Sequence, residues 1–333
     1  MADAELWRRA LAVHARPRLQ MSLADVLTSA VAYLAVGVGM YFALAVSPLI
    51  VLAAAPLSAA FLLRTYIVFH DCTHGSFLAS RRANLWVGRF CGLLVLSPFV
   101  RWRHDHAVHH ATSGDLDRRG VGDLPTLTVA EYYERSSSGR LAYRLIRNPL
   151  VMFGLGPIMA MIVGPRIAAR NARPRMRRSV FWTDAVLAVA AASLIWLMGF
   201  GGFLLVWAPG ALLAGAAGIW LFYVQHQFED AYWQRSECWS YADAALRGSS
   251  FLKLPQPLQY ITGNIGYHHV HHLSTRIPNY NLQRAHETNP ALQSVPTLSL
   301  WHGLRAVRLK LWDEHTGRLV TFAQARTCAP MAA

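Results

Sequence analysis

The chain has 333 residues, of which 54% are hydrophobic and only 15% charged, and its mean hydropathy is +0.25. This balance is more apolar than that of most soluble domains and indicates a membrane protein. The net charge of +14 would allow nucleic-acid binding, but no nucleic-acid-binding motif accompanies it and the arginines stand beside apolar runs. We therefore expect anionic lipid headgroups, and no nucleic acid, as the partners of this charge.

The first 20 residues are charged and lack the apolar core and cleavage site of a signal peptide, so we expect an amphipathic segment on the membrane surface. Four later apolar runs are each long enough to cross a hydrocarbon core of about 30 Å. They cover residues 26–46, 48–69, 180–200 and 203–224. Ser47 alone separates the first two, and Gly201 and Gly202 separate the last two, which predicts two tight helical hairpins.

Arginine placement predicts the orientation, because positive residues near span ends stay in the cytoplasm. Arginines precede the first run, follow the second and precede the third, whereas the two hairpin tips carry none. We therefore expect residues 1–25, 70–179 and 225–333 in the cytoplasm.

Two shorter apolar segments, near residues 85–100 and 150–164, fall short of a full span. We interpret both as re-entrant or interfacial, because a crossing at the first would separate the histidine clusters described below. No internal repeat or low-complexity tract divides the chain. The prediction is one domain over residues 1–333: an all-α membrane protein with four spans in two hairpins and a cytoplasmic helical cap. The four scattered cysteines are expected to be free thiols in a reducing compartment.

Fifteen histidines occur, and ten of them fall in three short stretches: HDCTH at 70–74, HDHAVHH at 104–110 and HHVHH at 268–272. Residues three and four apart share a helical face, so each stretch is expected to present one converging set of imidazoles. The sets are His70 with His74, His106 with His109 and His110, and His268 with His271 and His272. By spacing alone, His269 could replace His271 in the third set.

Position along the membrane adds a ninth imidazole. His70 follows directly after the second apolar run, and His226 stands two residues after the fourth, so both lie about one helical turn inside the cytoplasmic boundary. Nine imidazoles exceed the needs of one ion, since a structural zinc takes four ligands and a catalytic one typically three. Two ions with open positions fit better. Among the metals that suit nitrogen ligands we choose iron, because its open positions can bind dioxygen.

The other histidines are expected to have ordinary roles. His104 lies on the opposite helical face from its neighbours and is left out, and His14, His286, His302 and His315 are isolated. A ligating imidazole usually donates its second ring N–H to a carboxylate or carbonyl group. The residues near enough in sequence to accept it are Asp71, Asp105, Glu229, Asp230 and Asn264. We expect no catalytic residue apart from the ligands and such neighbours.

The three stretches resemble the histidine boxes of the membrane fatty acid desaturases, which have the forms H-x(3,4)-H, H-x(2,3)-H-H and (H/Q)-x(2,3)-H-H. The third form selects His271 over His269. The flanking stretches HDCTHGSF, YVQHQFEDAYW and NIGYHHVHHLSTRIPNYNL are similar to the bacterial acyl-lipid branch of that family. In relatives, the stretch that corresponds to VQHQFED supplies a further ligand, which supports His226.

The resemblance implies a di-iron enzyme that uses dioxygen and two electrons to form a cis double bond in an acyl chain, with a membrane lipid as the substrate. It also implies the bacterial inner membrane, with the active site facing the cytoplasm. No stretch resembles a cytochrome b5 or ferredoxin domain, so we expect a separate electron donor such as a ferredoxin.

Three other functions compete with this interpretation. Lipid hydroxylases, ketolases and acetylenases use similar boxes. An intramembrane metalloprotease would need H-E-x-x-H, whereas Asp71 stands in the place of the glutamate, and a protease has no use for the other boxes. A metal or proton transporter would place its ligands near the membrane midplane, whereas these histidines stand outside the apolar runs.

Overall fold

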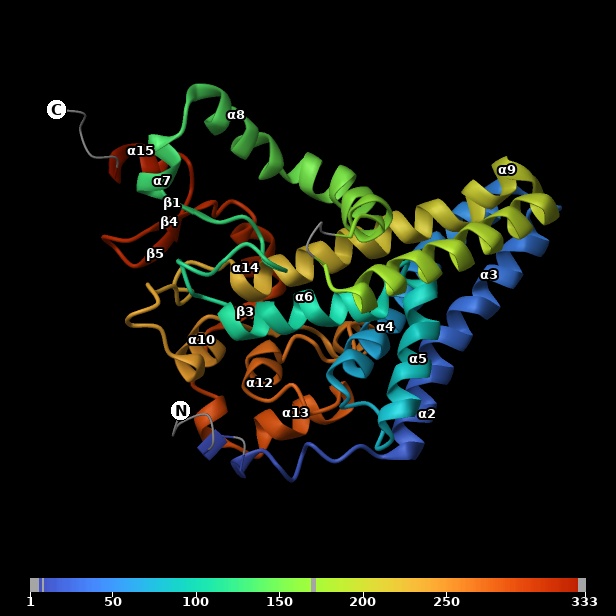
Figure 1. Ribbon diagram of the computed structural model, residues 1–333, viewed down its shortest axis with the longest axis horizontal. Helices are drawn as coiled ribbons and strands as arrows, with labels where there is room; N and C mark the ends of the chain where they lie inside the picture. Colours follow the sequence, from blue (N-terminus) through green and yellow to red (C-terminus); the bar gives the residue numbers. More distant parts are fainter. Residues whose placement is uncertain (1–5, 8, 169–171, 329–333) are drawn as a thin grey trace.

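The computed structural model describes residues 6–7, 9–168 and 172–328, with only the backbone of Cys328. Residues 1–5 of the predicted surface segment, and Arg8 of the orientation argument, lie outside this range. The described chain is mostly helical. Figure 1 shows long helices at one end of the molecule and a cap of shorter elements at the other.

The first two apolar runs form a pair of long helices. Helix α2 (Leu19–Val26), the π-helical segment η1 (Leu27–Val31) and α3 (Ala32–Ala43) make one continuous helix, which begins at Leu19 instead of residue 26. Helix α4 (Pro48–His74) begins after Ser47, whose hydroxyl accepts a hydrogen bond from the Leu49 N–H at 3.2 Å. Pro48 suits the first helical position because proline has no N–H, and an N–H at this position would have no acceptor within the helix. This cap explains the short turn between α3 and α4.

Helix α9 (Pro174–His226) contains both of the last two apolar runs. Gly199 interrupts it with φ 72° and ψ 161°, a conformation open almost only to glycine. Figure 1 shows the two halves of α9 lying side by side on either side of this break. The turn therefore falls at Gly199 and not at Gly201 and Gly202, which continue in helical conformation.

Within the described residues, three helices are long and apolar enough to cross a membrane, namely Leu19–Ala43, Pro48–His74 and Pro174–His226. Up to five qualify if each of two bent pairs counts as one span. Helix α5 (Arg81–Leu94) meets α6 (Phe99–Thr112) at 98°, and α8 (Ser137–Ile146) meets the segment Val151–Arg166 at 59°. That segment consists of η2 (Val151–Leu155), η3 (Ile158–Val163) and η4 (Gly164–Arg166). Each short apolar segment thus belongs to a sharply bent pair, which fits a broken span as well as a re-entrant segment.

The cap is built from short elements after α6 and after α9. Strand β1 (Leu127–Thr128) leads into α7 (Val129–Glu134), which begins with a capping box formed by Thr128 and Glu131. The elements after α9 are, in order, α10 (Tyr241–Arg247), β2 (Phe251–Lys253), α11 (Gln256–Ile261), α12 (His268–Leu273), α13 (Asn279–Glu287), η5 (Pro290–Leu292), β3 (Thr297–Ser299), α14 (Leu300–Ala306), β4 (Leu311–Asp313), β5 (Arg318–Val320) and α15 (Gln324–Cys328).

Two small sheets in the cap correct the all-helical prediction. Strand β4 pairs in parallel with β1 and antiparallel with β5, and β2 pairs in parallel with β3, with Leu252 opposite Leu298. None of these strands exceeds three residues. They are too short to leave an alternating pattern in the sequence. Their pairing gives hydrogen-bond partners to backbone groups where the chain returns across the cap.

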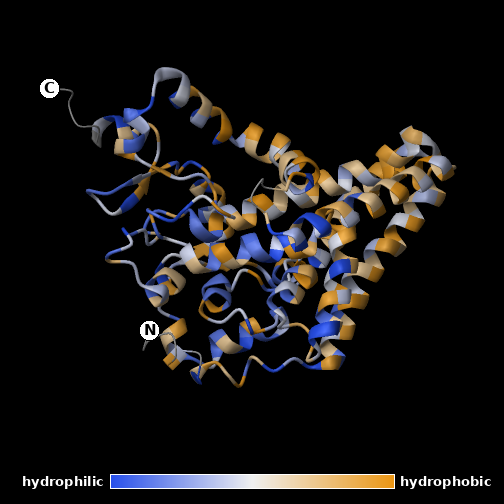
Figure 2. Cartoon of the chain, in the orientation of Figure 1, coloured by the Kyte–Doolittle hydropathy of each residue, from blue (hydrophilic) through white to orange (hydrophobic). Residues whose placement is uncertain are grey.

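Apolar side chains cover the outside of the long helices. Trp196 and Leu49 are 89% and 74% exposed, and Figure 2 shows hydrophobic residues along α3 and α9 and more hydrophilic residues in the cap. Large apolar surfaces of this kind mark contact with a membrane or another apolar partner. The helical end of the molecule therefore has the surface of a membrane protein.

The residues just before α2 pack against the cap. Leu11 is fully buried in a core that includes Leu252 and Val270. Asn281 of α13 donates a hydrogen bond to the carbonyl oxygen of His14 at 2.9 Å. From Leu11 onward, this stretch is therefore fastened to α13.

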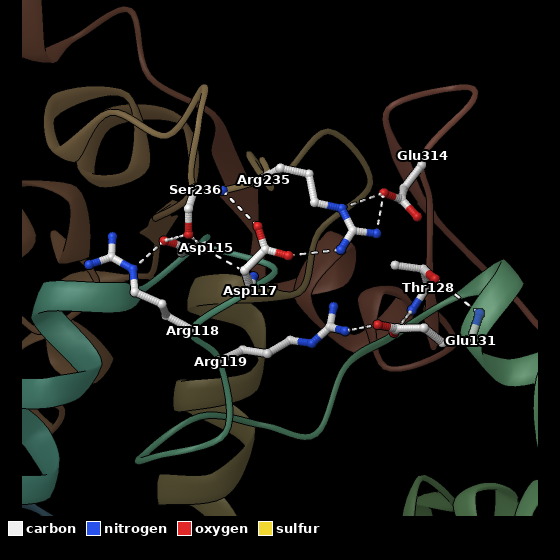
Figure 3. A network of polar contacts seen from close by, with 9 residues as sticks. All are labelled: Asp115, Asp117, Arg118, Arg119, Thr128, Glu131, Arg235, Ser236 and Glu314. Carbon is white, nitrogen blue, oxygen red and sulfur yellow. Dashed lines mark hydrogen bonds and ion pairs between the residues drawn. The ribbon is translucent and has the colours of Figure 1, made fainter.

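A polar network joins the segment after α6 to the loop after α9 and to the turn between β4 and β5 (Figure 3). The buried Asp115 accepts a hydrogen bond from the Ser236 hydroxyl at 2.9 Å. Arg235 bridges Asp117 and Glu314, each at 2.8 Å. Because α6 carries the second histidine stretch, this network holds the end of that helix in position.

Candidate metal centre

The nine histidines predicted as ligands lie together as two groups of ring nitrogens. In each group, one nitrogen from every ring lies within 4.8 Å of the others. The first group contains His70 and His74 at the end of α4, His106 and His110 of α6, and His271 of α12. The second contains His109 of α6, His226 at the end of α9, and His268 and His272 of α12.

The second and third stretches each divide between the two groups, which corrects the prediction of one converging set per stretch. Successive residues of an α-helix are about 100° apart around its axis. His106 and His110 therefore share a face, whereas His109 points away from His110 by about 100°. On α12, His268 and His272 go to the second group and His271 to the first.

Nitrogen separations within the groups fit a shared metal ion. The Nε2 atoms of His106 and His110 are 3.0 Å apart, and so are those of His226 and His268. Two nitrogens at right angles around a metal, each about 2.1 Å from it, would be about 3.0 Å apart, and two on opposite sides about 4.2 Å. The Nε2 atoms of His74 and His109 are buried without any hydrogen-bond partner. Such donor atoms suit a metal, because buried ring nitrogens otherwise need a partner.

Oxygen acceptors fix the orientation of several rings. The Nδ1 of His70 bonds the carboxylate of Asp71 at 3.1 Å, and the Nδ1 of His109 bonds that of Asp123 at 2.5 Å. The Nδ1 of His226 donates to the Gly248 carbonyl at 3.1 Å. An Nδ1–H held in this way leaves the lone pair of Nε2 free for a metal.

In the described chain, the other predicted acceptors form no hydrogen bond with the nine rings. Asp105 pairs with Arg101 one helical turn away, at 3.5 Å. The exposed Glu229 and Asp230 both pair with Arg318. Asn264 has φ 56° and reaches only the backbone carbonyl of Asn279 with its side chain.

Sequence reasoning missed Asp123, which stands 14 residues after His109 in a loop. A signal for it lies in Gly122, whose φ is 72°. A Cβ on Gly122 would lie 2.9 Å from the Asp105 carbonyl oxygen and 3.1 Å from the Cβ of His109. Only glycine lets this loop approach α6 closely enough for Asp123 to reach the ring.

Asn279 was also missed, and it extends the contacts of His70 into the first two helices. Its backbone N–H and its side-chain amide donate to the Asp71 carboxylate, at 2.7 and 3.0 Å. The same amide donates to Asp25 of α2 at 2.7 Å, and Asp25 forms an ion pair with Arg64 of α4. All four side chains are buried.

The histidines that were left out of the site lie elsewhere. His104 is exposed on α6. His269 is buried, but its Nε2 bonds the Nδ1 of His286 at 3.0 Å and it belongs to neither group. His14 bonds Thr288 at 3.1 Å.

Electrostatics favour neutral imidazoles on α12. Burial, together with the neighbouring histidines, lowers the pKa of His268, His271 and His272 well below the usual imidazole value. Protonation would place a charge where water cannot solvate it. These rings are therefore neutral near pH 7, as metal ligation requires.

An apolar cavity of about 490 Å³ begins beside the histidines and runs between α4, α9 and the η2–η3 segment. Its wall includes Trp102, whose ring centre lies 4.3 Å from that of His106, and Phe222, which lies 5.1 Å from His109. A second cavity, of about 780 Å³, lies between α3 and the first half of α9, and its lining includes none of the nine histidines.

Apolar helices long enough to cross a membrane, joined to a cluster of nine histidines, define a helical membrane protein with a candidate two-metal centre. Comparison with known proteins gives the family. Residues 47–302 match the family described as fatty acid desaturase. The chain belongs to the fatty acid desaturase family and is therefore an enzyme, an oxidoreductase.

Individual relatives agree with this assignment. The chain is 45% identical to a fatty acid desaturase of Bacillus subtilis over 312 residues, which is 94% of this chain and 89% of the relative. It is 29% identical to an sn-1 oleoyl-lipid 12-desaturase of Synechocystis sp., with 66% of this chain and 63% of the relative covered. A Synechocystis sn-1 acyl-lipid omega-3 desaturase (ferredoxin) is 28% identical, with 67% of this chain and 62% of the relative covered.

Proposed function

We propose that the chain is a di-iron, O2-dependent desaturase that introduces a cis double bond into the acyl chain of a membrane lipid. The apolar cavity carries this proposal, because Trp102 and Phe222 belong both to its wall and to the surroundings of the histidines. An alkyl chain in the cavity would therefore pass close to both groups of ring nitrogens.

The reaction removes one hydrogen from each of two adjacent methylenes. In balance, –CH2–CH2–, O2, two electrons and two protons give –CH=CH– and two water molecules. No side-chain acid or base can remove a proton from an alkyl methylene at neutral pH, so bound iron would supply the oxidising power.

The residues of the chain supply position and exclude water. Asp71 and Asp123 hold the rings of His70 and His109 in the tautomer that offers Nε2. Trp102 and Phe222 line the cavity beside His106 and His109 and would hold the substrate methylenes close to these rings. A dry wall of this kind also protects reactive species from side reactions.

The proposed topology has four spans: the continuous helix α2–η1–α3, helix α4, and the two halves of α9. The cap and the histidines would then face the cytoplasm, and the membrane would be the bacterial inner membrane. Support comes from the arginines before α9 and from the bacterial relatives.

Electrons would come from an external donor such as a ferredoxin. One relative is a Synechocystis sn-1 acyl-lipid omega-3 desaturase (ferredoxin), which supports such a donor. The net charge of +14 would also favour an acidic donor, because opposite charges speed association.

The test is expression in a bacterium that lacks its own desaturase, followed by mass spectrometry of its lipids. We expect a new double bond at one position with the wild-type chain. His109→Ala should abolish it and lower the iron content below about two per chain, whereas the matched variant His104→Ala changes an exposed histidine of the same helix and should do neither. Oxygen retained in the product would instead indicate a hydroxylase. Full activity of His109→Ala would remove that residue from the site.

A further inference from the structure

Arg147 follows directly after α8 and is almost fully buried, with 1% of its surface exposed. Its Nη2 donates to the Tyr223 hydroxyl at 3.1 Å and to Oε1 of Gln227 at 2.8 Å, and its Nη1 donates to the Pro125 carbonyl at 3.2 Å. All of these partners are neutral. Its Nε is buried without a hydrogen-bond partner. The guanidinium thus keeps a full positive charge and one spare donor inside the protein.

A second cation stands beside the same tyrosine. Lys310 is 5% exposed, and its Nζ is buried without a hydrogen-bond partner. That Nζ lies 5.4 Å from the centre of the Tyr223 ring, and the guanidinium carbon of Arg147 lies 5.0 Å from it. Burial, with the charge of Arg147, lowers the pKa of Lys310 to about 7. A negative charge nearby would therefore decide whether this amine is protonated.

Among the described residues, no carboxylate pairs with either cation. Within the part of the chain that the structure describes, the partners of Arg147 are hydroxyl, amide and carbonyl oxygens, and Lys310 has none. Buried charges in proteins are normally paired, because the interior solvates them poorly. Two cations around one ring, each with an unused donor, make a site that an anion would complete.

The space beside Arg147 is the apolar cavity next to the histidines. Arg147 lines it together with Ile146, Val151 and Leu155 of the α8–η2 segment. The outer face of α8 is apolar and open, with Leu141 58% exposed. A helix with one apolar face and two arginines, as α8 is, has the character of a helix on a membrane surface. Arg147 thus lies where the cavity approaches that surface, and Lys310 lies behind the cavity wall, beside the same Tyr223 ring.

We propose that Arg147 and Lys310 bind the phosphodiester of the phospholipid whose acyl chain occupies the cavity. This inference rests on the proposed function, because it takes the cavity as the acyl site. A guanidinium fork matches phosphate oxygens, and a lysine adds a point charge. The substrate class would then be phospholipids, and a neutral lipid with the same acyl chains would lack this contact.

Binding can be measured without turnover. Lipids with brominated acyl chains quench tryptophan fluorescence on contact, and Trp102 lies in the cavity wall. The full-length protein in detergent would be titrated with a brominated diacyl phospholipid and with the matching diacylglycerol, which has no phosphate. The variants are Lys310→Met, Arg147→Lys, and the control Arg308→Met, which removes an exposed positive charge two residues before Lys310.

We expect the wild type to prefer the phospholipid, and Lys310→Met to weaken phospholipid binding by about tenfold, because a hydrogen bond to a charged group is lost. Diacylglycerol binding should stay unchanged in this variant, which also shows that the cavity is intact. Arg147→Lys keeps the positive charge but loses the paired N–H donors of the guanidinium group. It should weaken phospholipid binding less than Lys310→Met does. Arg308→Met should behave as wild type.

Three results would overturn the inference: equal binding of both lipids by the wild type, equal losses in Lys310→Met and Arg308→Met, or displacement of the phospholipid by millimolar inorganic phosphate, which would indicate a small-anion site. The proposed function is tested separately. If cells form the double bond but the wild type binds both lipids equally, only the proposed anion site is refuted. If Lys310→Met abolishes the preference for the phospholipid but cells form no double bond, only the desaturase proposal is refuted.

Discussion

Asn279 offers a sharp test of how the first two helices support the metal centre. Its side-chain amide donates to two buried carboxylates, Asp71 at 3.0 Å and Asp25 at 2.7 Å. Asp71 in turn holds the ring of His70. Replacement of Asn279 by alanine removes both amide contacts and leaves the histidines themselves unchanged.

The expected magnitude follows from these contacts. Hydrogen bonds to charged groups contribute roughly 1.5–3 kcal/mol each. The loss is partly offset, because Asp71 keeps the backbone N–H of residue 279 and Asp25 keeps Arg64. We therefore expect Asn279→Ala to lower the free energy of unfolding by about 2–4 kcal/mol. Loss of a group that orients a ligand's partner typically weakens metal binding by about tenfold to a hundredfold.

Iron affinity would be measured anaerobically by competition with a coloured Fe(II) chelator, and stability by thermal unfolding in detergent. The matched control is Asn281→Ala, on the same helix. Asn281 donates a buried hydrogen bond to the His14 carbonyl at 2.9 Å and accepts a partly buried one from Arg18 at 2.9 Å. Asn281→Ala therefore also loses two side-chain contacts, but neither leads to a histidine of the two groups. We expect a loss of stability in both variants and weaker iron binding only in Asn279→Ala. Equal iron affinity in the two variants would refute the positioning role of Asn279.

Two further predictions concern the cavity and pH. A Cβ on Gly218 would meet only Leu63, at 3.9 Å, so the Gly218→Leu variant should fold, and its side chain should fill part of the cavity. We expect product formation to fall by about tenfold or more and the iron content to stay unchanged. The control Gly37→Leu places the same side chain in the other cavity and should change neither product formation nor iron content. The folded pKa of His268, His271 and His272 lies below the unfolded value of about 6.5, so the iron-free protein should be fully stabilised above that pH and lose stability as the pH falls below it. Thermal unfolding between pH 8 and pH 5 checks this, and an unchanged midpoint would contradict it.

The sequence predicted which histidines lie together, because their spacing on helices and the number of ligands that a metal needs leave few alternatives. The apolar runs end just before His70 and His226, which predicts one depth for those two rings, and helical spacing excludes His104. The sequence did not predict the division into two groups. That division depends on where α4, α6, α9 and α12 stand relative to one another, and a pattern along one helix carries no such information.

Acceptors for the ring N–H groups were predicted less well, because sequence proximity is a poor guide to them. Asp71 follows its partner directly, and a backbone tether explains that success. Asp123 and Asn279 reach the site from a loop and from another helix, whereas Asp105 is close in sequence but pairs with Arg101. Gly122 was the local signal that this loop approaches α6 closely. Its positive φ and the lack of space for a Cβ both require glycine at this position.

The histidine groups also join the two ends of the molecule. His70, His74 and His226 stand at the ends of the long apolar helices, whereas His268, His271 and His272 belong to the cap. A metal bound by both sets would hold the cap against the membrane helices, because breaking that contact would cost ligand bonds. The link from Asp25 through Asn279 to Asp71 makes the same connection without a metal. The geometry of the site is thus shared between the two halves of the fold, so a displacement of either half would alter both groups of nitrogens together.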